Sequence, residues 1–145
     1  MTTTLRLATP NDLPAINARY AAIGFVPSDA DDLVVLALRD GVVAGQGRIV
    51  PLDAHNGELG GIHVVPAFEG TGIARAIVDC LLGQAQVPTL YCIPFAELAP
   101  FYGSVGFVPV TDRAPVPPRV LEKLQWCDGQ YGRPVLLMVR TAVTG

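Results

Sequence analysis

Two glycines and an arginine lie where a predicted strand leads into a predicted helix, in the segment Val64-Val65-Pro66-Ala67-Phe68-Glu69-Gly70-Thr71-Gly72-Ile73-Ala74-Arg75. Such a turn brings unpaired backbone N–H groups and the positive end of the helix dipole to one spot. Gly70 and Gly72 allow an anion to approach the backbone with no Cβ in the way, and Arg75 can add a positive charge. This pattern favours a phosphate site. The alternative is that the two glycines only make a tight connection.

Two common nucleotide-binding motifs do not occur at this turn. The sequence contains no Gly-Lys-Ser or Gly-Lys-Thr, which excludes a P-loop. Gly70-Thr71-Gly72 also lacks the third glycine at the spacing of a Rossmann fingerprint. A phosphate site at this turn must therefore belong to a different class.

Strands and helices are expected to alternate on both sides of the turn. Runs of apolar residues predict strands over 5–8, 33–38, 42–50, 58–65, 89–93, 107–110 and 135–140. Helical spacing and start signals predict helices over 9–22, 70–82, 96–104 and 118–126, with Gly83 ending the second of them. Asp40-Gly41 is the strongest hairpin signal. With no repeat or linker, the alternation predicts an α/β fold in one domain over residues 1–145.

The composition excludes several classes of protein. Half of the 145 residues are hydrophobic and 16% are charged, so the chain should bury a core rather than remain disordered. The net charge of −3 and the lack of a basic block argue against nucleic-acid binding. No apolar stretch is long enough to span a membrane and the first residues lack signal-peptide features, so we expect no membrane partner and a cytoplasmic location. Three widely spaced cysteines predict neither a disulfide framework nor a metal site.

Two segments resemble motifs of the GNAT superfamily of acetyl-CoA-dependent N-acetyltransferases. Glu69-Gly70-Thr71-Gly72-Ile73-Ala74 is similar to motif A, Arg/Gln-x-x-Gly-x-Gly/Ala, and departs from it only at Glu69. Phe101-Tyr102-Gly103-Ser104-Val105-Gly106-Phe107 resembles the family's Phe-Tyr-x-x-x-Gly-Phe and follows at the expected distance. The resemblance is strongest over residues 5–110, and residues 111–145 form an elaborated C-terminal part.

The resemblance implies a fold and a set of cofactor contacts. The GNAT fold is α/β (α+β), with a single mixed central sheet of six to seven strands flanked by helices and a splay at the strand before motif A. Backbone groups of Ile62, His63 and Val64 would pair with the pantetheine arm of acetyl-CoA. The pyrophosphate would be held by the residues of the turn, which are Gly70, Thr71, Gly72, Ile73, Ala74 and Arg75. The cosubstrate is acetyl-CoA, and no metal is implied.

The resemblance also implies proton donors and acceptors. Tyr102 matches the tyrosine that commonly protonates the CoA sulfur, and a phenol suits this role because its ordinary pKa of about 10 is close to that of a thiol. The alternative role for Tyr102 is that of a core aromatic. Glu58 matches a general-base glutamate of some members, although alone it would be a solvated acid at a strand end. His63 is a second candidate base because it titrates near neutral pH, and a water chain is the third route.

The reaction implied is direct transfer of an acetyl group from acetyl-CoA to a primary amine of a small molecule or peptide. The alternative is a non-catalytic acyl-CoA-binding or regulatory domain of the same fold. Two departures motivate it: the carboxylate of Glu69, and Phe95, which stands where the family often has an asparagine that contacts the cofactor. The acids of residues 29–32 either favour a cationic amine or form a solvated loop. The short strands near the carboxyl terminus would allow a homodimer.

Overall fold

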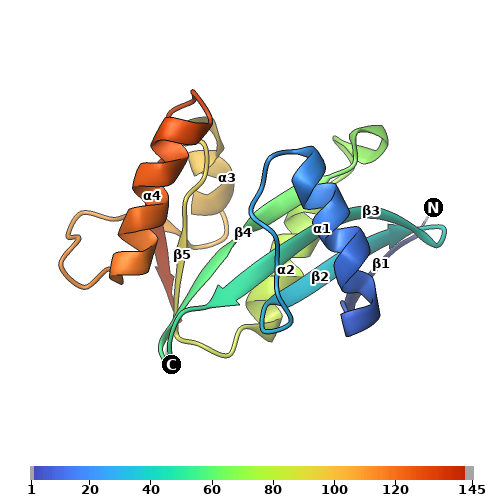
Figure 1. Cartoon of the computed structure of the whole chain (residues 1–145), viewed down its shortest axis with the longest axis horizontal. Coiled ribbons are helices and arrows are strands. Elements are labelled where there is room, and N and C mark those ends of the chain that lie inside the picture. Colours follow the sequence, from blue (N-terminus) through green and yellow to red (C-terminus); the bar gives the residue numbers. More distant parts are fainter. Residues whose placement is uncertain (1, 143–145) are drawn as a thin grey trace. The chain divides into compact units, whose positions relative to one another are not determined.

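The computed structural model describes residues 2–142, and within them seven strands form one mixed sheet flanked by helices (Figure 1). The strands are β1 (Thr3–Leu7), β2 (Leu33–Arg39), β3 (Val42–Pro51), β4 (Asn56–Val64), β5 (Thr89–Cys92), β6 (Val108–Pro109) and β7 (Met138–Thr141). The helices are α1 (Leu13–Ala22), α2 (Ile73–Gln84), α3 (Ala99–Gly103) and α4 (Pro118–Gln130). The strand order is β1-β2-β3-β4-β5-β7-β6. Strands β4 and β5 run parallel, whereas the β1–β2, β2–β3, β5–β7 and β6–β7 pairs are antiparallel. The expected fold class is confirmed.

The chain folds as two compact units that share strand β4. The first unit contains the residues up to Val50 together with Gly61–Ala85. The second contains Pro51–Gly60 and the residues from Gln86 onward. The glycine turn therefore lies in the first unit, and Glu58 and Tyr102 lie in the second.

In the first unit, helices α1 and α2 cover opposite faces of the sheet (Figure 1). Ile16 and Tyr20 of α1 pack against Val34 and Leu36 of β2 in one buried cluster. These residues recur at helical spacing on α1 and at every second position on β2, which is the pattern of one face in each element. The cluster fixes α1 on the sheet face to which the even-numbered residues of β2 point.

Glycines of β3 allow helix α2 to lie close to the other face. A Cβ on Gly47 would come within 2.6 Å of side-chain atoms of both Ile62 and Ile77, and a Cβ on Gly45 would come within 3.0 Å of Ile77. Side chains do not tolerate such distances, so a larger residue at position 47 would push the helix away from the strand. The glycines thus set the distance between the sheet and the helix that follows the turn.

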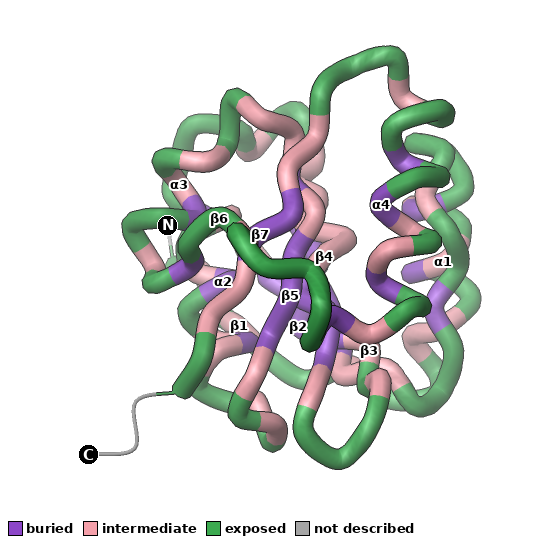
Figure 2. The backbone as a smooth tube through the Cα atoms, turned by 90° about the vertical axis from the view of Figure 1, so that its left-hand side faces the viewer, coloured by how far each residue is buried: buried purple, intermediate pink, exposed green. Residues whose placement is uncertain are grey.

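In the second unit, helix α4 packs against β5 and the residue before β7. The buried side chains of this cluster are Tyr91, Val116, Val120, Leu124 and Leu137. Figure 2 shows the buried positions of α4 recurring along one side of the helix, whereas β6 is exposed. Strand β5 pairs with β4 up to Glu58 and Tyr91, and β4 continues beyond this pairing to Val64, as the expected splay requires.

The hairpin turn was predicted correctly, whereas the predicted bounds of helix α2 differ from those of the structure. Asp40 and Gly41 form the predicted hairpin turn, with positive φ angles of 51° and 79°. Helix α2 begins after Gly72 rather than at Gly70, because both residues have positive φ, at 82° and 76°. The prediction that Gly83 ends this helix is wrong. Gly83 does not have a positive φ, and the helix includes it and ends one residue later, at Gln84.

The C-terminal elements differ in length from those expected. Helix α4 continues beyond Trp126 because its buried side recurs as far as Cys127. Strand β7 starts later than predicted, and Val135 forms only an isolated bridge with Phe95. Strand β6 is limited to two residues, in part because Pro109 has no N–H to donate to a ladder. The segment 96–104 contains a short 3-10 turn followed by α3.

Candidate active site

The turn before α2 presents open backbone at the start of a twelve-residue helix. Gly70 and Gly72 both have positive φ, and no atom lies within 4 Å of the position that a Cβ would take on either. The hydroxyl of Thr71 donates to the carbonyl oxygen of Phe68, which ties the turn to the residues before it. The first N–H groups of a helix have no partner within the helix, so this turn can accept an anion.

Two charged side chains flank the turn. Arg75 lies in the first turn of α2 and is exposed, and Glu69 directly precedes Gly70 and is exposed as well. A guanidinium favours a bound phosphate, whereas a carboxylate at the same end of a helix competes with it. The turn therefore carries opposing charges, as the sequence indicated.

Strand β4 bends at Gly61, directly before the residues expected to pair with the pantetheine arm. Gly61 has a positive φ of 60°, and the hydroxyl of Tyr20 donates to its carbonyl oxygen at 2.8 Å. A Cβ at this position would lie 2.6 Å from the Tyr20 hydroxyl and 2.9 Å from Nε of Arg48. Both the backbone angle and the crowding require glycine here.

His63 is half-buried on the part of β4 that follows the bend. Burial lowers the pKa of His63, and the positive charge of Arg19 lowers it further, while the charge of Glu69 raises it. A lowered pKa leaves the imidazole neutral at pH 7, which is the form that accepts a proton. His63 therefore meets one chemical requirement of a general base.

Tyr102 lies buried on α3, with 6% of its surface exposed. Its ring packs edge-on against Phe101 at 5.0 Å and against Phe107 at 5.9 Å. Burial raises the pKa of Tyr102, so the phenol stays protonated at neutral pH. Among the hydrogen bonds of the described residues none involves its hydroxyl, and this oxygen is not one of the buried unpaired polar atoms. The ring is part of the core, and the hydroxyl retains some contact with solvent.

Glu58 is a buried acid, with 6% of its surface exposed. This burial contradicts the alternative of a solvated acid at a strand end and leaves the proposed role as a base untested. The ammonium group of Lys123, on α4, donates to both of its carboxylate oxygens, at 2.9 and 2.5 Å. Glu58 also adds to the effect of burial in raising the pKa of Cys92, and Cys92 in turn raises the pKa of Tyr102. Within the second unit, the two candidate catalytic side chains therefore lie in electrostatic range of a shared cysteine.

The Glu58–Lys123 pair is expected to stabilise the second unit. Replacing Lys123 by methionine should lower the free energy of unfolding by about 2 kcal/mol, because a buried carboxylate loses its partner. The loss is less than for a fully buried pair, since the Lys123 side chain is 31% exposed. Urea unfolding measures the change.

The matched control is Arg119→Met, which removes an exposed cation from the same helix and should change stability by less than about 0.5 kcal/mol. The double variant Glu58→Gln/Lys123→Met should be more stable than Lys123→Met alone, because it leaves no buried charge. Equal unfolding midpoints for wild type and Lys123→Met would show that the pair is not stabilising.

A polar cluster on β3 and α1 was not predicted from the sequence. Nε of Arg19 donates to Gln46 at 2.6 Å, and the amide of Gln46, which is fully buried, donates to the carbonyl of Ile16 at 3.2 Å. Arg48 donates to the hydroxyl of Ser28 at 2.6 Å. The signal in the sequence is that Gln46 and Arg48 alternate with glycines in an otherwise apolar strand, which directs both to one face.

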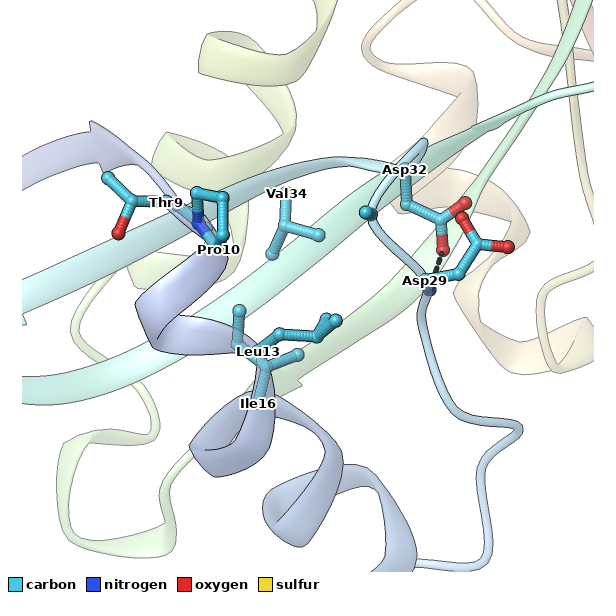
Figure 3. A pocket seen from close by; sticks show the side chains of 9 residues that line it. Thr9, Pro10, Leu13, Ile16, Asp29, Asp32 and Val34 are labelled. Carbon is cyan, nitrogen blue, oxygen red and sulfur yellow. Dashed lines mark hydrogen bonds between the residues drawn. The ribbon is translucent and has the colours of Figure 1, made fainter.

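A small pocket opens between α1, β2 and the loop that carries the acids of residues 29–32 (Figure 3). Leu13, Ile16 and Val34 form its apolar side, and Asp29 and Asp32 lie together on the loop. The backbone N–H of Asp29 donates to the carboxylate of Asp32 at 3.3 Å. Burial raises the pKa of Asp32. Asp29 and Asp31 are exposed, as in the alternative of a solvated loop, and the loop also contains hydrogen bonds between its own residues.

Within residues 2–142, the structure contains no group of three side chains that could hold a metal ion. The same part of the chain has no helix with the length and apolar character needed to cross a membrane.

Phe95, which replaces a frequent cofactor-binding asparagine, is packed by the C-terminal residues. Its ring meets Tyr131 edge-on at 5.5 Å, and the guanidinium of Arg133 lies 3.8 Å from its centre. Arg133 also pairs with Glu97. The aromatic residue at this position therefore contributes to packing within the second unit.

The family comparison agrees with this geometry. A family model described as Acetyltransferase (GNAT) family matches residues 5–107, which include both motif segments. A comparison with curated proteins found no match.

Solved structures with a similar fold include enzymes crystallised with CoA. N-acetylglutamate synthase from Neisseria gonorrhoeae, complexed with coenzyme A and L-arginine, has a TM-score of 0.73 and 14% identity over 97% of this chain, which spans 33% of that protein. Rv2747 from Mycobacterium tuberculosis, in complex with CoA, has a TM-score of 0.73 and 23% identity, covering 97% of this chain and 99% of the other. The ribosomal-protein-S18-alanine N-acetyltransferase from Escherichia coli has a TM-score of 0.68 and 19% identity, covering 99% and 97%. The chain spans about a third of the length of the gonococcal synthase, and at these identities the likeness shows the fold.

Proposed function

Because this chain belongs to the GNAT acetyltransferase family, we propose that it transfers an acetyl group directly from acetyl-CoA to a primary amine of a small molecule or peptide. The observation that carries this proposal is the open glycine turn at the start of α2. Two structural neighbours illustrate the range of acceptors, since one is named for N-acetylglutamate and the other for an alanine of a ribosomal protein. The proposal therefore includes both small-molecule amines and the amines of peptides.

The turn fits the pyrophosphate of acetyl-CoA. Gly70 and Gly72 are exposed and have positive φ angles, and the empty space where a Cβ would stand on each admits a ligand. Residues 70–75 would hold the phosphates, and backbone groups of residues 62–64 would pair with the pantetheine arm. When bound, acetyl-CoA supplies a thioester whose carbonyl carbon accepts an amine.

Tyr102 is the proposed proton donor to the departing sulfur. Its raised pKa keeps the phenol protonated, and its hydroxyl accepts or donates no hydrogen bond within the described residues. Its ring is held on both sides by Phe101 and Phe107, so the hydroxyl has a fixed position. A positioned general acid of this kind accelerates a reaction by about 10²-fold or more.

Two side chains are proposed as candidates to take the proton of the amine. Glu58 already binds Lys123 through both oxygens, so an acceptor amine would have to replace that ammonium group. His63 is neutral and needs no such exchange, because its pKa is lowered by burial and by Arg19. These contacts favour His63, directly or through water, as the base.

Acetyl transfer is tested by mixing the purified protein with acetyl-CoA and a panel of amines, and by following free thiol and the mass of the acetylated product. We expect thiol release that depends on the amine, measured against a reaction without amine. Tight CoA binding with no turnover on any amine would support the non-catalytic alternative. No CoA binding at millimolar concentration would contradict both.

A further inference from the structure

We propose that Arg48, assisted by Arg19, binds a carboxylate of the acceptor, so that the acceptor is an amino acid rather than a simple amine. This inference rests on the acetyl transfer proposed above and names its substrate class. It is carried by the burial of one guanidinium, by the absence of an ion-pair partner for it among the described residues, and by its place beside the bend of β4.

Arg48 is a buried cation that is only partly compensated. It is 4% exposed, it donates to the hydroxyl of Ser28, and its guanidinium lies 4.3 Å from the centre of the Tyr20 ring. Arg48 is in none of the ion pairs among the described residues. A guanidinium has five N–H donors and its burial is costly without an anion, so a carboxylate ligand would complete this site.

The charged groups around Arg48 include a second arginine, and no acid forms an ion pair with either arginine among the described residues. Arg19 is half-buried, its Nε is bonded to the neutral Gln46, and it too is in none of those ion pairs. Asp32 is in electrostatic range of Arg48: burial raises the pKa of Asp32, whereas the Ser28 hydroxyl and the charge of Arg48 lower it. Two acids therefore act on the two guanidinium groups: Asp32 acts on Arg48, and Asp12, which is itself paired with Arg6, acts on Arg19.

The site lies next to the strand that would carry the cofactor. A Cβ on Gly61 would touch Nε of Arg48, and Gly61 directly precedes residues 62–64, whose backbone is proposed to pair with the pantetheine arm. A carboxylate held at Arg48 would bring the rest of a small molecule beside this strand. Because Arg48 is almost fully buried, a flat protein surface could not contact it, so the proposed ligand is a small anion.

Positive charge at this place also suits the chemistry of the amine. Nearby cations disfavour an ammonium ion and favour the neutral amine, which is the nucleophile. The lowered pKa of His63, to which Arg19 contributes, shows this effect on a neighbouring group. One pair of arginines can therefore bind the carboxylate and help to deprotonate the amine of the same molecule.

The test is a binding measurement on the reaction products, which needs no turnover. The N-acetyl derivatives of the twenty amino acids are compared with their C-terminal carboxamides by calorimetry, in the presence of CoA. We expect at least one acid to bind about tenfold or more tightly than its amide, which reflects one charge-assisted contact. Arg48→Gln should remove this preference while CoA affinity is unchanged, and Arg48→Lys should restore it only in part, since lysine lacks the planar fork.

If Arg48→Gln does not fold, the comparison of acids with amides on the wild-type protein still tests whether a carboxylate is bound. Arg19→Gln provides a milder variant, because Arg19 is only half-buried. Equal binding of acids and amides, or binding of neither while CoA binds, would overturn the inference. If amines without a carboxylate are then acetylated, the proposed function stands alone. If acids bind selectively but no amine is acetylated, the carboxylate site is supported and the proposed function fails.

Discussion

Replacing Tyr102 by phenylalanine should lower kcat about 100-fold and leave the affinity for CoA unchanged, because the change removes a proton donor and almost no contact surface. The packing argument is specific to this residue. The ring is held by Phe101 and Phe107, and both contacts persist in phenylalanine. The hydroxyl makes no hydrogen bond within the described residues, so its removal breaks none. Thiol release at saturating acetyl-CoA and amine measures kcat, and calorimetry measures CoA affinity.

The matched control is Tyr91→Phe, which removes a hydroxyl from another buried tyrosine of the second unit. Tyr91 packs in the cluster under α4 and is 4% exposed. Its removal should leave kcat unchanged. Melting temperatures of both variants separate a lost proton donor from a damaged core. An unchanged kcat in Tyr102→Phe would exclude the donor role, and a parallel loss of kcat and melting temperature would assign Tyr102 to packing alone.

The features that could be predicted from the sequence have local causes. A hairpin at Asp40-Gly41 needs two residues that tolerate positive φ, and these two have it. The turn before α2 needs the same freedom at Gly70 and Gly72, and both use it. The periodicity of apolar residues indicates which side of each strand or helix is buried, and it was sufficient to predict the order of the elements along the chain. The same reasoning failed at Gly83, because glycine within a helix and glycine after its end look alike in a sequence.

The features that could not be predicted depend on residues far apart in the chain. Glu58 and Lys123 are 65 positions apart, and their contact depends on how α4 packs against the sheet. One clue was present: Lys123 falls at the helical spacing of Val120 and Cys127, on the side of the helix that is buried. A cation on an apolar stripe needs a partner, but the sequence does not say which acid it meets.

The cluster around Arg48 has the same origin. Gln46 and Arg48 point to one face of β3, and that much follows from the alternation of a strand. Their partners Arg19 and Ser28 come from a helix and a loop earlier in the chain. Folding brings the two arginines to one face of the sheet, where the charge of Arg19 lowers the pKa of His63.

The second large effect is expected at Gly72. Replacing Gly72 by valine should weaken CoA binding about 50-fold, because a β-branched side chain is strained at the positive φ of 82° and also fills the open space over the turn. Loss of one or two charge-assisted bonds from backbone N–H groups to the pyrophosphate is worth about 2–3 kcal/mol, which corresponds to this change. Calorimetric titration with CoA measures it.

Gly83→Val is the matched control, because Gly83 lies near the other end of the same helix, has ordinary helical angles and open space around its Cα. Valine and glycine differ little in helix propensity, so this variant should leave the free energy of unfolding nearly unchanged. Its CoA affinity should stay within about twofold of that of wild type. If Gly72→Val binds CoA as tightly as Gly83→Val, the phosphates are held elsewhere. The affinities of wild type and Gly72→Val are also compared for 3′-dephospho-CoA. If the variant loses the same factor of affinity for this ligand as for CoA, the turn contacts the pyrophosphate and not the 3′-phosphate, as proposed for the start of α2.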